Sequence, residues 1–586
     1  MNRWILGITY GGHDTAAALL KDGEILAACA QERFNREKHT REFPVDAIRE
    51  CLKIGGVQIR DLSAIAVGFD PFLYINETYL KPALEHRYRL EFLLNDAERI
   101  KKIAEFEKTI REQTGFEGAV EFHNHHLCHL ASAYYPSGFD RCLLVSQDGV
   151  GETQTGMIAE GIDGEIHVRD ASNVYPHSMG LLYSAVTFYL GWRHHCDEGI
   201  LMGLASYGDA RAKLPGSNRT YLEVFEEIVR ETGEFGYEID LSWIEYHKVR
   251  DTWISEKFKR TFGPKREYTD PLTAHHRNIA AALQQRLEDL SISFLQRAKK
   301  KFPQARLALA GGVSLNCSLN GKIEESRLFE ELYVQPASGD DGVSIGACYL
   351  AYKQRAPEFR PAKRHDSYLG SRFTDAEIEA ALRKNGLPYS RAENIYETVA
   401  QKLAEGKVVA WFQGGAEFGP RALGNRSILA KPWPESMRDY LNNEVKFREP
   451  FRPYAPAVLA EQSAEYFQIR QESPHMLIAT QIRPEKKAEI PATVHVDGTC
   501  RVQTVTGETN PRFRKLLEAF HRKTGCPVLL NTSFNVKGQP MINTPEQAID
   551  SLRTAKLDLL VMGEFYLEKA ALSAVVRQTE PEAAQR

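Results

Sequence analysis

Residues 123–152 read HNHHLCHLASAYYPSGFDRCLLVSQDGVGE, and this stretch decides the fold. His125 and His129 are spaced i, i+4, so in a helix both imidazoles project from one face and can bind one metal ion. The turn signal Pro136-Ser137-Gly138 follows, and then an apolar run predicts a buried strand that ends at Asp148. A carboxylate at a strand end beside two histidines indicates a metal site. The alternative is one capping and one packing histidine, with Asp148 only starting a turn.

The two ends of the N-terminal half carry the same pattern. Residues 4–10, 15–20 and 24–30 predict three strands, joined by a Gly/Asp turn and then by a tight hairpin turn. Residues 142–171 repeat this order, which indicates an internal duplication. Such duplicated units resemble the actin–hexokinase type of ATPase fold, in which the two turns hold the phosphates of a nucleotide. Two unrelated hairpins are the alternative.

Bulk properties narrow the class of protein. The chain has 586 residues, a net charge of -4 and 43% hydrophobic residues, which is ordinary for a soluble protein with several domains. This net charge does not favour binding to nucleic acid or to an anionic membrane. The sequence has no run of about 18 apolar residues, so we expect no membrane span. The nine cysteines form no CxxC pair, so we expect a cytoplasmic protein with free thiols.

Two further turns of the N-terminal half carry candidate ligands. The predicted strand 306–310 leads into Gly311-Gly312-Val313 and Asn316, where backbone N–H groups before a helix could bind a phosphate or an adenosine. No GxxxxGK[ST] loop occurs. The turn Ser338-Gly339-Asp340-Asp341-Gly342 is a solvated turn by default, but it could also supply the second carboxylate of the metal site.

The C-terminal half is marked by loop cations. The basic, proline-containing segment 352–364 predicts a domain boundary, which we place between residues 1–356 and 357–586. Beyond it, arginines and lysines stand among Gly, Pro and aromatic residues: Arg421, Arg426, Lys446, Arg448, Arg452, Arg501 and Lys537. Cations held in this way predict an oxyanion pocket rather than the alternative, a solvated basic rim.

Five motifs in one order resemble a known family. The series HHxxHxxSAxYPS, DGxGE, SGDDG, EFGPRALGNRS and NTSFN is similar to that of the NodU/CmcH-type O-carbamoyltransferases, which include TobZ-like antibiotic carbamoyltransferases. The likeness runs from Gly7 to about Leu567. It implies an N-terminal α/β ATPase-fold domain, similar to tRNA threonylcarbamoyl-transfer proteins, and a C-terminal YrdC-like α/β domain.

The resemblance also implies an activity. In this family carbamoyl phosphate and ATP give carbamoyl adenylate in the YrdC-like domain, and the carbamoyl group is then moved to a hydroxyl of a small-molecule acceptor. The implied cofactors are ATP, Mg2+ and Fe2+, although His/Asp ligands equally allow Mn2+ or Zn2+. The family likeness suggests a homodimer. Residues 70–115 and 209–272 are the expected walls of the acceptor pocket.

The resemblance also implies the site residues, matched to the family position by position. The expected metal ligands are His125, His129, Asp148 and Asp340, with Asp340 chosen over Asp341. His13 matches the transfer-site histidine, and Lys446, Arg501 and Ser533 match residues around the phosphates. The remaining expected nucleotide contacts are Gly311, Gly312, Val313, Asn316, Arg421, Arg426, Arg452 and Asn535. One departure is Ile200, where the family pattern suggests a lysine, so nucleotide contacts near residues 197–208 stay open.

Two other functions are compatible with parts of this pattern. A tRNA threonylcarbamoyl-type transferase would share the N-terminal motifs, but the chain lacks a basic stripe. A non-catalytic nucleotide-binding regulator would share the fold, but it would not need all four expected metal ligands.

Overall fold

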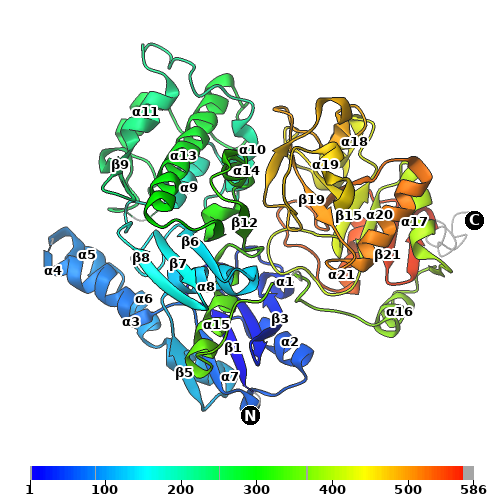
Figure 1. Ribbon diagram of the computed structural model, residues 1–586, viewed down its shortest axis with the longest axis horizontal. Coiled ribbons are helices and arrows are strands. Elements are labelled where there is room, and N and C mark those ends of the chain that lie inside the picture. Colours follow the sequence, from blue (N-terminus) through cyan, green and yellow to red (C-terminus); the bar gives the residue numbers. More distant parts are fainter. Residues whose placement is uncertain (1–2, 86, 250, 364–366, 572–586) are drawn as a thin grey trace, which may run out of the picture. The chain divides into compact units, whose positions relative to one another are not determined.

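A computed structural model describes residues 3–85, 87–249, 251–363 and 367–571 (Figure 1). The chain forms two compact units. Unit 1 comprises Met1–Glu32 and His39–Arg364, and unit 2 comprises Arg33–Lys38 and His365–Arg586. The division after Arg364 lies eight residues beyond the boundary expected from composition. The short segment Arg33–Lys38, which belongs to unit 2 although it precedes most of unit 1, was not expected.

Unit 1 contains two five-stranded sheets with the same strand order. The first sheet runs β3-β2-β1-β4-β5 and the second runs β8-β7-β6-β11-β12. In each sheet the first three strands are antiparallel and the last two pair in parallel. This repetition confirms the predicted duplication and α/β class. The strands are β1 (Trp4–Thr9), β2 (Ala16–Lys21), β3 (Glu24–Ala30), β4 (Ala64–Val67), β5 (Ala119–Phe122), β6 (Arg141–Gln147), β7 (Gly156–Ile162), β8 (Glu165–Asp170), β11 (Arg306–Ala310) and β12 (Glu331–Val334).

Two buried helices pack at the centre of unit 1, namely α8 (His125–Ser137) and α15 (Val343–Arg355). They approach so closely that a Cβ atom added at Gly346 would lie 1.8 Å from the carbonyl oxygen of Cys128. Helix α15 also touches β1, where a Cβ atom at Gly7 would lie 2.0 Å from the carbonyl oxygen of Ser344. Glycine at these positions therefore sets the position of α8, which carries the two expected histidine ligands.

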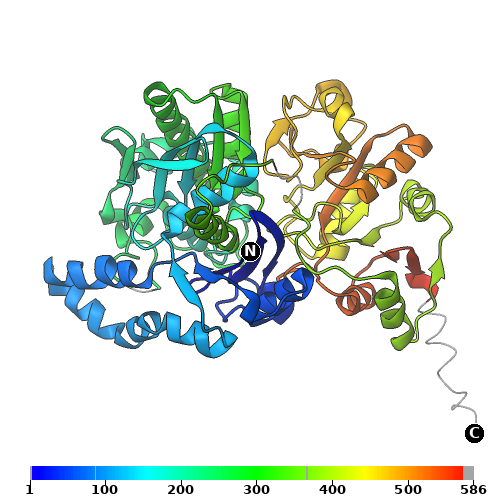
Figure 2. The ribbon, with the colours of Figure 1, turned by 60° about the horizontal axis from the view of Figure 1, so that its bottom comes forward.

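One detail of unit 1 differs from the sequence prediction. Pro136 does not start a turn: it lies in the last turn of α8, and Gly138, whose φ is 72°, caps the helix. The charged stretch after β4 is helical and consists of α5 (Arg87–Asn95), α6 (Ala97–Ala104) and α7 (Phe106–Thr114), which Figure 2 shows in light blue.

The other helices and strands of unit 1 surround the two sheets. They are α2 (Val45–Gly55), α3 (Pro71–Ile75), α4 (Lys81–Glu85), α5 (Arg87–Asn95), α6 (Ala97–Ala104), α7 (Phe106–Thr114), α9 (Met179–Tyr189), α10 (Glu198–Ala205), α11 (Tyr221–Ile228), the hairpin β9 (Val229–Thr232) and β10 (Gly236–Ile239), α12 (Glu256–Phe262), α13 (Ala274–Lys301) and α14 (Cys317–Ser326). Helix α1 (Glu32–Asn35) begins in unit 1 and continues into unit 2.

Unit 2 is built on an eight-stranded mixed sheet in the order β13-β22-β21-β14-β15-β20-β16-β19. Its strands are β13 (Ser390–Arg391), β14 (Val409–Phe412), β15 (Arg426–Ala430), β16 (Ala455–Leu459), β19 (Gln503–Val505), β20 (Val528–Ser533), β21 (Leu559–Met562) and β22 (Phe565–Glu568); β17 (Ala479–Gln481) and β18 (Thr499–Arg501) form a separate pair. The unit has the α/β composition expected, and its likeness to the YrdC fold stays a prediction.

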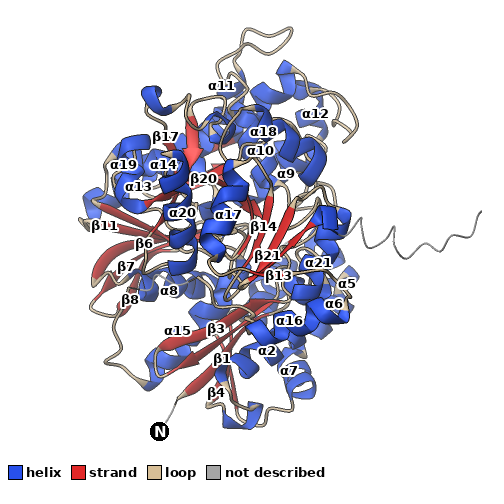
Figure 3. Ribbon diagram, turned by 90° about the vertical axis from the view of Figure 1, so that its right-hand side faces the viewer, coloured by secondary structure: helices blue, strands red, loops and turns tan. Residues whose placement is uncertain are grey.

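Helices cover this sheet. Helices α16 (Asp375–Lys384) and α21 (Pro545–Thr554) share one apolar cluster with Ala410 and Phe412, alternate residues of β14 that point to the same face. Helices α17 (Ile395–Ala404) and α20 (Pro511–Thr524) pack against each other and lie over the strands in Figure 3. Shorter helices are α18 (Ser436–Tyr440) and α19 (Ser463–Tyr466). None of the helices in the described part of the chain is long and apolar enough to cross a membrane.

Candidate functional site

The two histidines of the opening stretch meet as their spacing predicts. His125 and His129 lie one turn apart on α8, and their Nε2 atoms are 3.0 Å from each other. Both side chains are buried, His129 completely. The Nδ1–H group of His125 donates to the carbonyl oxygen of Gly68 at 3.3 Å, so Nε2 is the ring atom that would bind a metal ion after giving up its proton.

Asp148 follows directly after β6 and faces both histidines. Its Oδ2 atom is 3.4 Å from His125 Nε2 and 3.5 Å from His129 Nε2. Its other oxygen, Oδ1, accepts a 2.9 Å hydrogen bond from the backbone N–H of Gly312. The expected glycine pair therefore orients this carboxylate: a Cβ atom at position 312 would lie only 2.7 Å from Oδ1.

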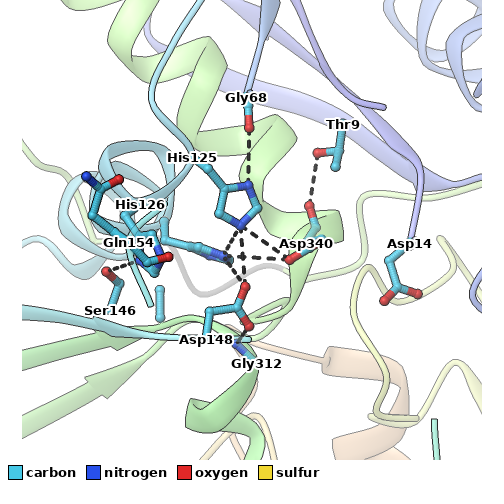
Figure 4. Close-up of polar contacts among 12 residues, drawn as sticks. Thr9, Asp14, Gly68, His125, His126, Ser146, Asp148, Gln154, Gly312 and Asp340 are labelled. Atoms are coloured by element: carbon cyan, nitrogen blue, oxygen red, sulfur yellow. Dashed lines mark hydrogen bonds and ion pairs between the residues drawn. The ribbon is translucent and has the colours of Figure 1, made fainter. Parts of the chain in front are cut away.

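Asp340 completes the group from a short helical turn, Asp340–Gly342, which follows β12. Its Oδ1 atom lies 3.5 Å from His125 Nε2 and 3.8 Å from His129 Nε2. Its backbone carbonyl accepts a hydrogen bond from Thr9 Oγ1 at 2.9 Å, whereas the carboxylate of Asp341 accepts from the N–H of Gly342. Figure 4 shows His125, Asp148 and Asp340 converging on one point. Of the two adjacent acids, Asp340 faces the histidines.

These four residues form what we call the four-donor cluster, and its dimensions fit one metal ion. One donor atom from each residue lies within 4.8 Å of every other. Metal–ligand bonds of about 2.1 Å place neighbouring donors about 3.0 Å apart at right angles and about 3.4 Å apart in a tetrahedron. The observed contacts between histidine and carboxylate, 3.4 to 3.8 Å, approach these values. Two imidazoles and two carboxylates suit Fe2+, Mn2+ or Zn2+.

The charges in the four-donor cluster stabilise one another. Burial alone would lower the pKa of His125, but the carboxylates of Asp340 and Asp148 outweigh it and raise the pKa well above its usual value. Burial alone would raise the pKa of Asp148, but its contacts with His125 and His129 hold it well below its usual value. A cluster that favours ionised carboxylates is prepared for a cation.

His126 has a structural role between the two expected ligands. Its Nε2–H group donates to the carbonyl oxygen of Gln154 and its Nδ1 atom accepts from Ser146 Oγ, each at 2.9 Å. Burial, helped by His125 and His129, lowers its pKa to about 3, so it stays neutral. The ring therefore anchors α8 to the second sheet.

Glu152 anchors the beginning of α8. Its fully buried carboxylate accepts from the backbone N–H groups of His125 and Asp70 and from the side-chain amide of Asn124, at 2.8 to 3.0 Å. Burial raises its pKa above the usual value despite these bonds. A carboxylate at a helix N-terminus satisfies backbone N–H groups that have no partner within the helix. Glu152 belongs to the DGxGE motif, but no sequence signal predicted that it would bind the beginning of a helix.

The turn of the first repeat lies beside the four-donor cluster. His13 Nδ1 is 2.8 Å from Asp14 Oδ2, to which it donates, and 3.9 Å from Oδ2 of Asp340. Burial would lower the pKa of His13, but Asp340 and Asp14 raise it to about 9. The side chain is 31% exposed and therefore open to a second molecule. The expected transfer-site histidine thus neighbours the expected metal ligands.

The other expected nucleotide contacts of unit 1 lie in the turn after β11 and at the start of α14. Gly311, with φ of 90°, runs so close to Gln147 that a Cβ atom there would lie 2.2 Å from its carbonyl oxygen. Val313 lies in the helical turn that begins at Gly312, and Asn316 caps α14 and exchanges hydrogen bonds with Gln284. Ile200 is a buried residue of α10.

In unit 2, Lys446 is buried at the end of the π-helical turn Leu441–Lys446. Its Nζ group donates to the carbonyl oxygens of Ser533 and Asn535 at 2.7 and 2.8 Å and to Asn535 Oδ1 at 2.5 Å. Burial, followed by the charges of Arg448 and Arg452, lowers its pKa well below the usual value. Lys446, Ser533 and Asn535, all expected site residues, therefore lie together.

Lys446 is part of a basic cluster, which we define as Lys38, Lys446, Arg448, Arg452 and Arg501. Its members repel one another. The charges of Arg448, Arg452 and Lys38 all lower the pKa of Lys446. Burial lowers the pKa of Arg448 to about 10, and the charges of Arg452 and Arg501 add to this effect. Glu449, 3.6 Å from Arg452, is an acidic neighbour. Cations gathered in this way suit a phosphate. Lys38 has no sequence signal, because it lies about 400 residues from the others.

Arg426 differs from the other expected nucleotide contacts. The family resemblance implies a nucleotide contact, but its guanidinium group is fully buried, lies 3.7 Å from the centre of the Phe412 ring and donates to the carbonyl oxygens of Gln413 and Ser371. Burial lowers its pKa to about 9. This arginine holds its loop together instead of facing an anion. Arg421, in the same loop, is half-buried.

Fold and site together define a two-unit α/β protein with a metal-type donor cluster in one unit and a cationic, phosphate-type cluster in the other. Two family models match the chain: Carbamoyltransferase N-terminus over residues 4–349 and Carbamoyltransferase C-terminus over residues 400–569. The chain belongs to the carbamoyltransferase family, and it is a transferase.

Several known proteins are similar to this chain. The chain is 36% identical to an uncharacterised protein of Synechocystis, over 97% of each chain, and 35% identical to the nodulation protein NolNO of Sinorhizobium fredii, over 96% of this chain and 80% of that protein. It is 31% identical to the 3'-hydroxymethylcephem-O-carbamoyltransferase of Streptomyces clavuligerus, over 64% and 65% of the two chains. Component A of the Acidaminococcus fermentans (R)-2-hydroxyglutaryl-CoA dehydratase aligns with 60% of this chain and 99% of its own, at 16% identity and a TM-score of 0.33.

Proposed function

We propose that this carbamoyltransferase is ATP-dependent and acts on a hydroxyl group of a small molecule, a sugar or a natural product. Unit 2 would convert carbamoyl phosphate, ATP and one water into carbamoyl adenylate, phosphate and pyrophosphate. Unit 1 would then pass the carbamoyl group to the acceptor oxygen and release AMP. The observation that carries this proposal is the position of His13, which lies within 3.9 Å of Asp340 and thus beside the four-donor cluster.

The basic cluster supports adenylate formation in unit 2. Carbamoyl phosphate and ATP together bring many negative charges into one place, and Lys446, Arg452 and Arg501 offset their repulsion. Ser533 and Asn535 hold Lys446 at the end of β20, which positions its charge. We propose further phosphate contacts from Arg421, and from the backbone around Gly311, Gly312, Val313 and Asn316 for a nucleotide in unit 1.

In unit 1 the four-donor cluster would hold Fe2+, with Mn2+ or Zn2+ as the alternatives. A divalent ion bound there supplies Lewis acidity to a phosphate or carbonyl oxygen. His13 would take the proton of the acceptor hydroxyl as the new C–O bond forms, because its ring is reachable from solvent. Asp340 contributes most to the raised pKa of His13, so a cation held by Asp340 would lower that pKa. With Nδ1 donating to Asp14, Nε2 is then the ring atom that loses its proton and accepts that of the hydroxyl.

The remaining features of the proposal concern the cellular setting. ATP would be bound with Mg2+, the protein would act in the cytoplasm, and it would form a homodimer. Its nine cysteines are all free thiols, which is compatible with a reducing compartment. The acceptor in the name of the cephem relative carries a hydroxymethyl group, which is the kind of alcohol proposed here.

The test uses the purified full-length chain with carbamoyl phosphate, ATP and Mg2+. We expect pyrophosphate release that depends on carbamoyl phosphate, and carbamoyl adenylate detectable by mass spectrometry. A reaction without carbamoyl phosphate is the control. If neither pyrophosphate nor the adenylate forms with metal-loaded protein, the proposal is wrong.

A further inference from the structure

The side chain of Asp14 joins two histidines outside the four-donor cluster. One oxygen, Oδ2, accepts from Nδ1 of His13 at 2.8 Å, and the other, Oδ1, accepts from Nδ1 of His39 at 2.7 Å. Both bonds are short for N–H···O contacts. His13 and His39 together hold the pKa of Asp14 far below its usual value, although burial opposes them. Both oxygens of the carboxylate are therefore held by hydrogen bonds.

His39 is itself held in place. Its backbone N–H donates to Glu32 Oε2 at 3.0 Å, and the next residue accepts at its carbonyl from the N–H of Thr15 at 3.4 Å. His39 is also the residue at which the chain returns to unit 1 after Arg33–Lys38. The segment 39–40 is thus attached to the segment 14–15 through both side chain and backbone.

The backbone around His13 adopts a conformation that most residues avoid. Asp14, His39 and His195 have φ values of 57°, 57° and 56°, in the left-handed region. The rings of His13 and His195 have their centres 5.4 Å apart. Left-handed conformations of non-glycine residues cost of order 1–3 kcal/mol and persist where surrounding structure enforces them, often at functional sites. Three such residues near the partly exposed His13 indicate that the surrounding structure holds this histidine in a fixed position.

We propose that Asp14, braced by His39, is the positioning residue that sets the orientation and tautomer of His13 for carbamoyl transfer. The carboxylate fixes the proton on Nδ1 of His13 and turns Nε2 toward the acceptor. His39 keeps Asp14 from rotating away, by occupying its second oxygen. This inference rests on the proposed function, which supplies the reaction that His13 serves.

The chain offers closely matched variants. Asp14→Asn keeps the size of the side chain but offers an acceptor at only one of its two terminal atoms, so it cannot accept from His13 and His39 at both. At position 39, His39→Asn keeps an N–H donor for Asp14, whereas His39→Asp has the same size but only repels it; both residues tolerate a left-handed backbone. Asp163→Asn is the control, because Asp163 is an exposed turn residue with a similar φ of 50°.

The experiment measures two steps in full-length protein loaded with Mn2+. Pyrophosphate release from carbamoyl phosphate and ATP reports adenylate formation, and AMP release with water as the acceptor reports transfer. We expect Asp14→Asn and His39→Asp to lower kcat for AMP release roughly 100-fold, the size of a general-base contribution. Pyrophosphate release in a first turnover and KM for carbamoyl phosphate stay within about twofold of wild type, so carbamoyl adenylate accumulates. His39→Asn and Asp163→Asn retain transfer.

The outcomes separate this inference from the proposed function. Wild-type transfer in Asp14→Asn, or equal loss in His39→Asn and His39→Asp, overturns the positioning role. Absence of pyrophosphate in the wild type overturns the proposed function instead. In that case a crystal structure of Asp14→Gly, which tolerates the left-handed backbone, decides the matter without turnover. We expect the His13 ring to turn away from its present orientation, and an unchanged ring refutes the inference.

Discussion

Replacing Gly312 by alanine is expected to weaken metal binding, although position 312 offers no ligand. The new Cβ atom would lie 2.7 Å from Oδ1 of Asp148. An unstrained contact between carbon and oxygen is about 3.3 Å, so the carboxylate has to retreat by roughly 0.6 Å. Metal–ligand distances tolerate about 0.2 Å. Loss of such a supporting contact typically weakens binding 10- to 100-fold, which is about 1.4–2.7 kcal/mol.

The assay is an Mn2+ titration followed by electron paramagnetic resonance, with the wild type, Gly312→Ala and Gly149→Ala in parallel. Gly149 is next to Asp148, but a Cβ atom there meets nothing closer than 3.5 Å, so Gly149→Ala should bind Mn2+ like the wild type. Equal Mn2+ affinity in wild type and Gly312→Ala would refute the idea that the glycine pair sets the position of Asp148.

Three other outcomes are expected. His129→Ala removes a fully buried residue that we propose as a metal ligand; it should retain a wild-type circular dichroism spectrum but carry no metal after dialysis, as measured by atomic emission. Burial lowers the pKa of Lys446, so binding of carbamoyl phosphate should take up a proton at pH values between that lowered pKa and about 10.4. The affinity for carbamoyl phosphate should therefore fall as pH rises through this window. Calorimetry in buffers of different ionisation enthalpy should show the proton uptake, and Lys446→Met should abolish it. Gly346→Ala should destabilise the protein by about 1–3 kcal/mol through overpacking against Cys128, and thermal denaturation should show no such loss for Gly199→Ala, whose Cβ atom meets nothing within 4 Å.

Local sequence patterns predicted much of the fold and of the four-donor cluster. The i, i+4 spacing of His125 and His129 depends only on helical periodicity, and Asp148 is positioned by the end of a buried strand. The duplication was visible because each copy repeats the same strands and turns. Asp340 lies about 190 residues further on; its turn allowed a second carboxylate ligand, but only the family resemblance selected Asp340 over Asp341.

Other features depend on long-range packing that no local pattern reveals. Lys38 enters the basic cluster because Arg33–Lys38 belongs to unit 2, and His39 reaches Asp14 across a separation of 25 residues. Arg426 resembles its neighbours in sequence, yet its backbone partners bury it completely, whereas Arg421 stays half-buried. An arginine between Gly and aromatic residues indicates a loop, but the fold decides whether the guanidinium faces solvent or carbonyl oxygens.

The most direct test of a two-centre transferase compares His13→Asn with Lys446→Met, each supplied with carbamoyl phosphate, ATP and Mg2+, while mass spectrometry follows carbamoyl adenylate. We predict that His13→Asn makes the adenylate and accumulates it, whereas Lys446→Met makes none. Adenylate formation by Lys446→Met, or its loss in folded, metal-loaded His13→Asn, would contradict the division of labour between the two units.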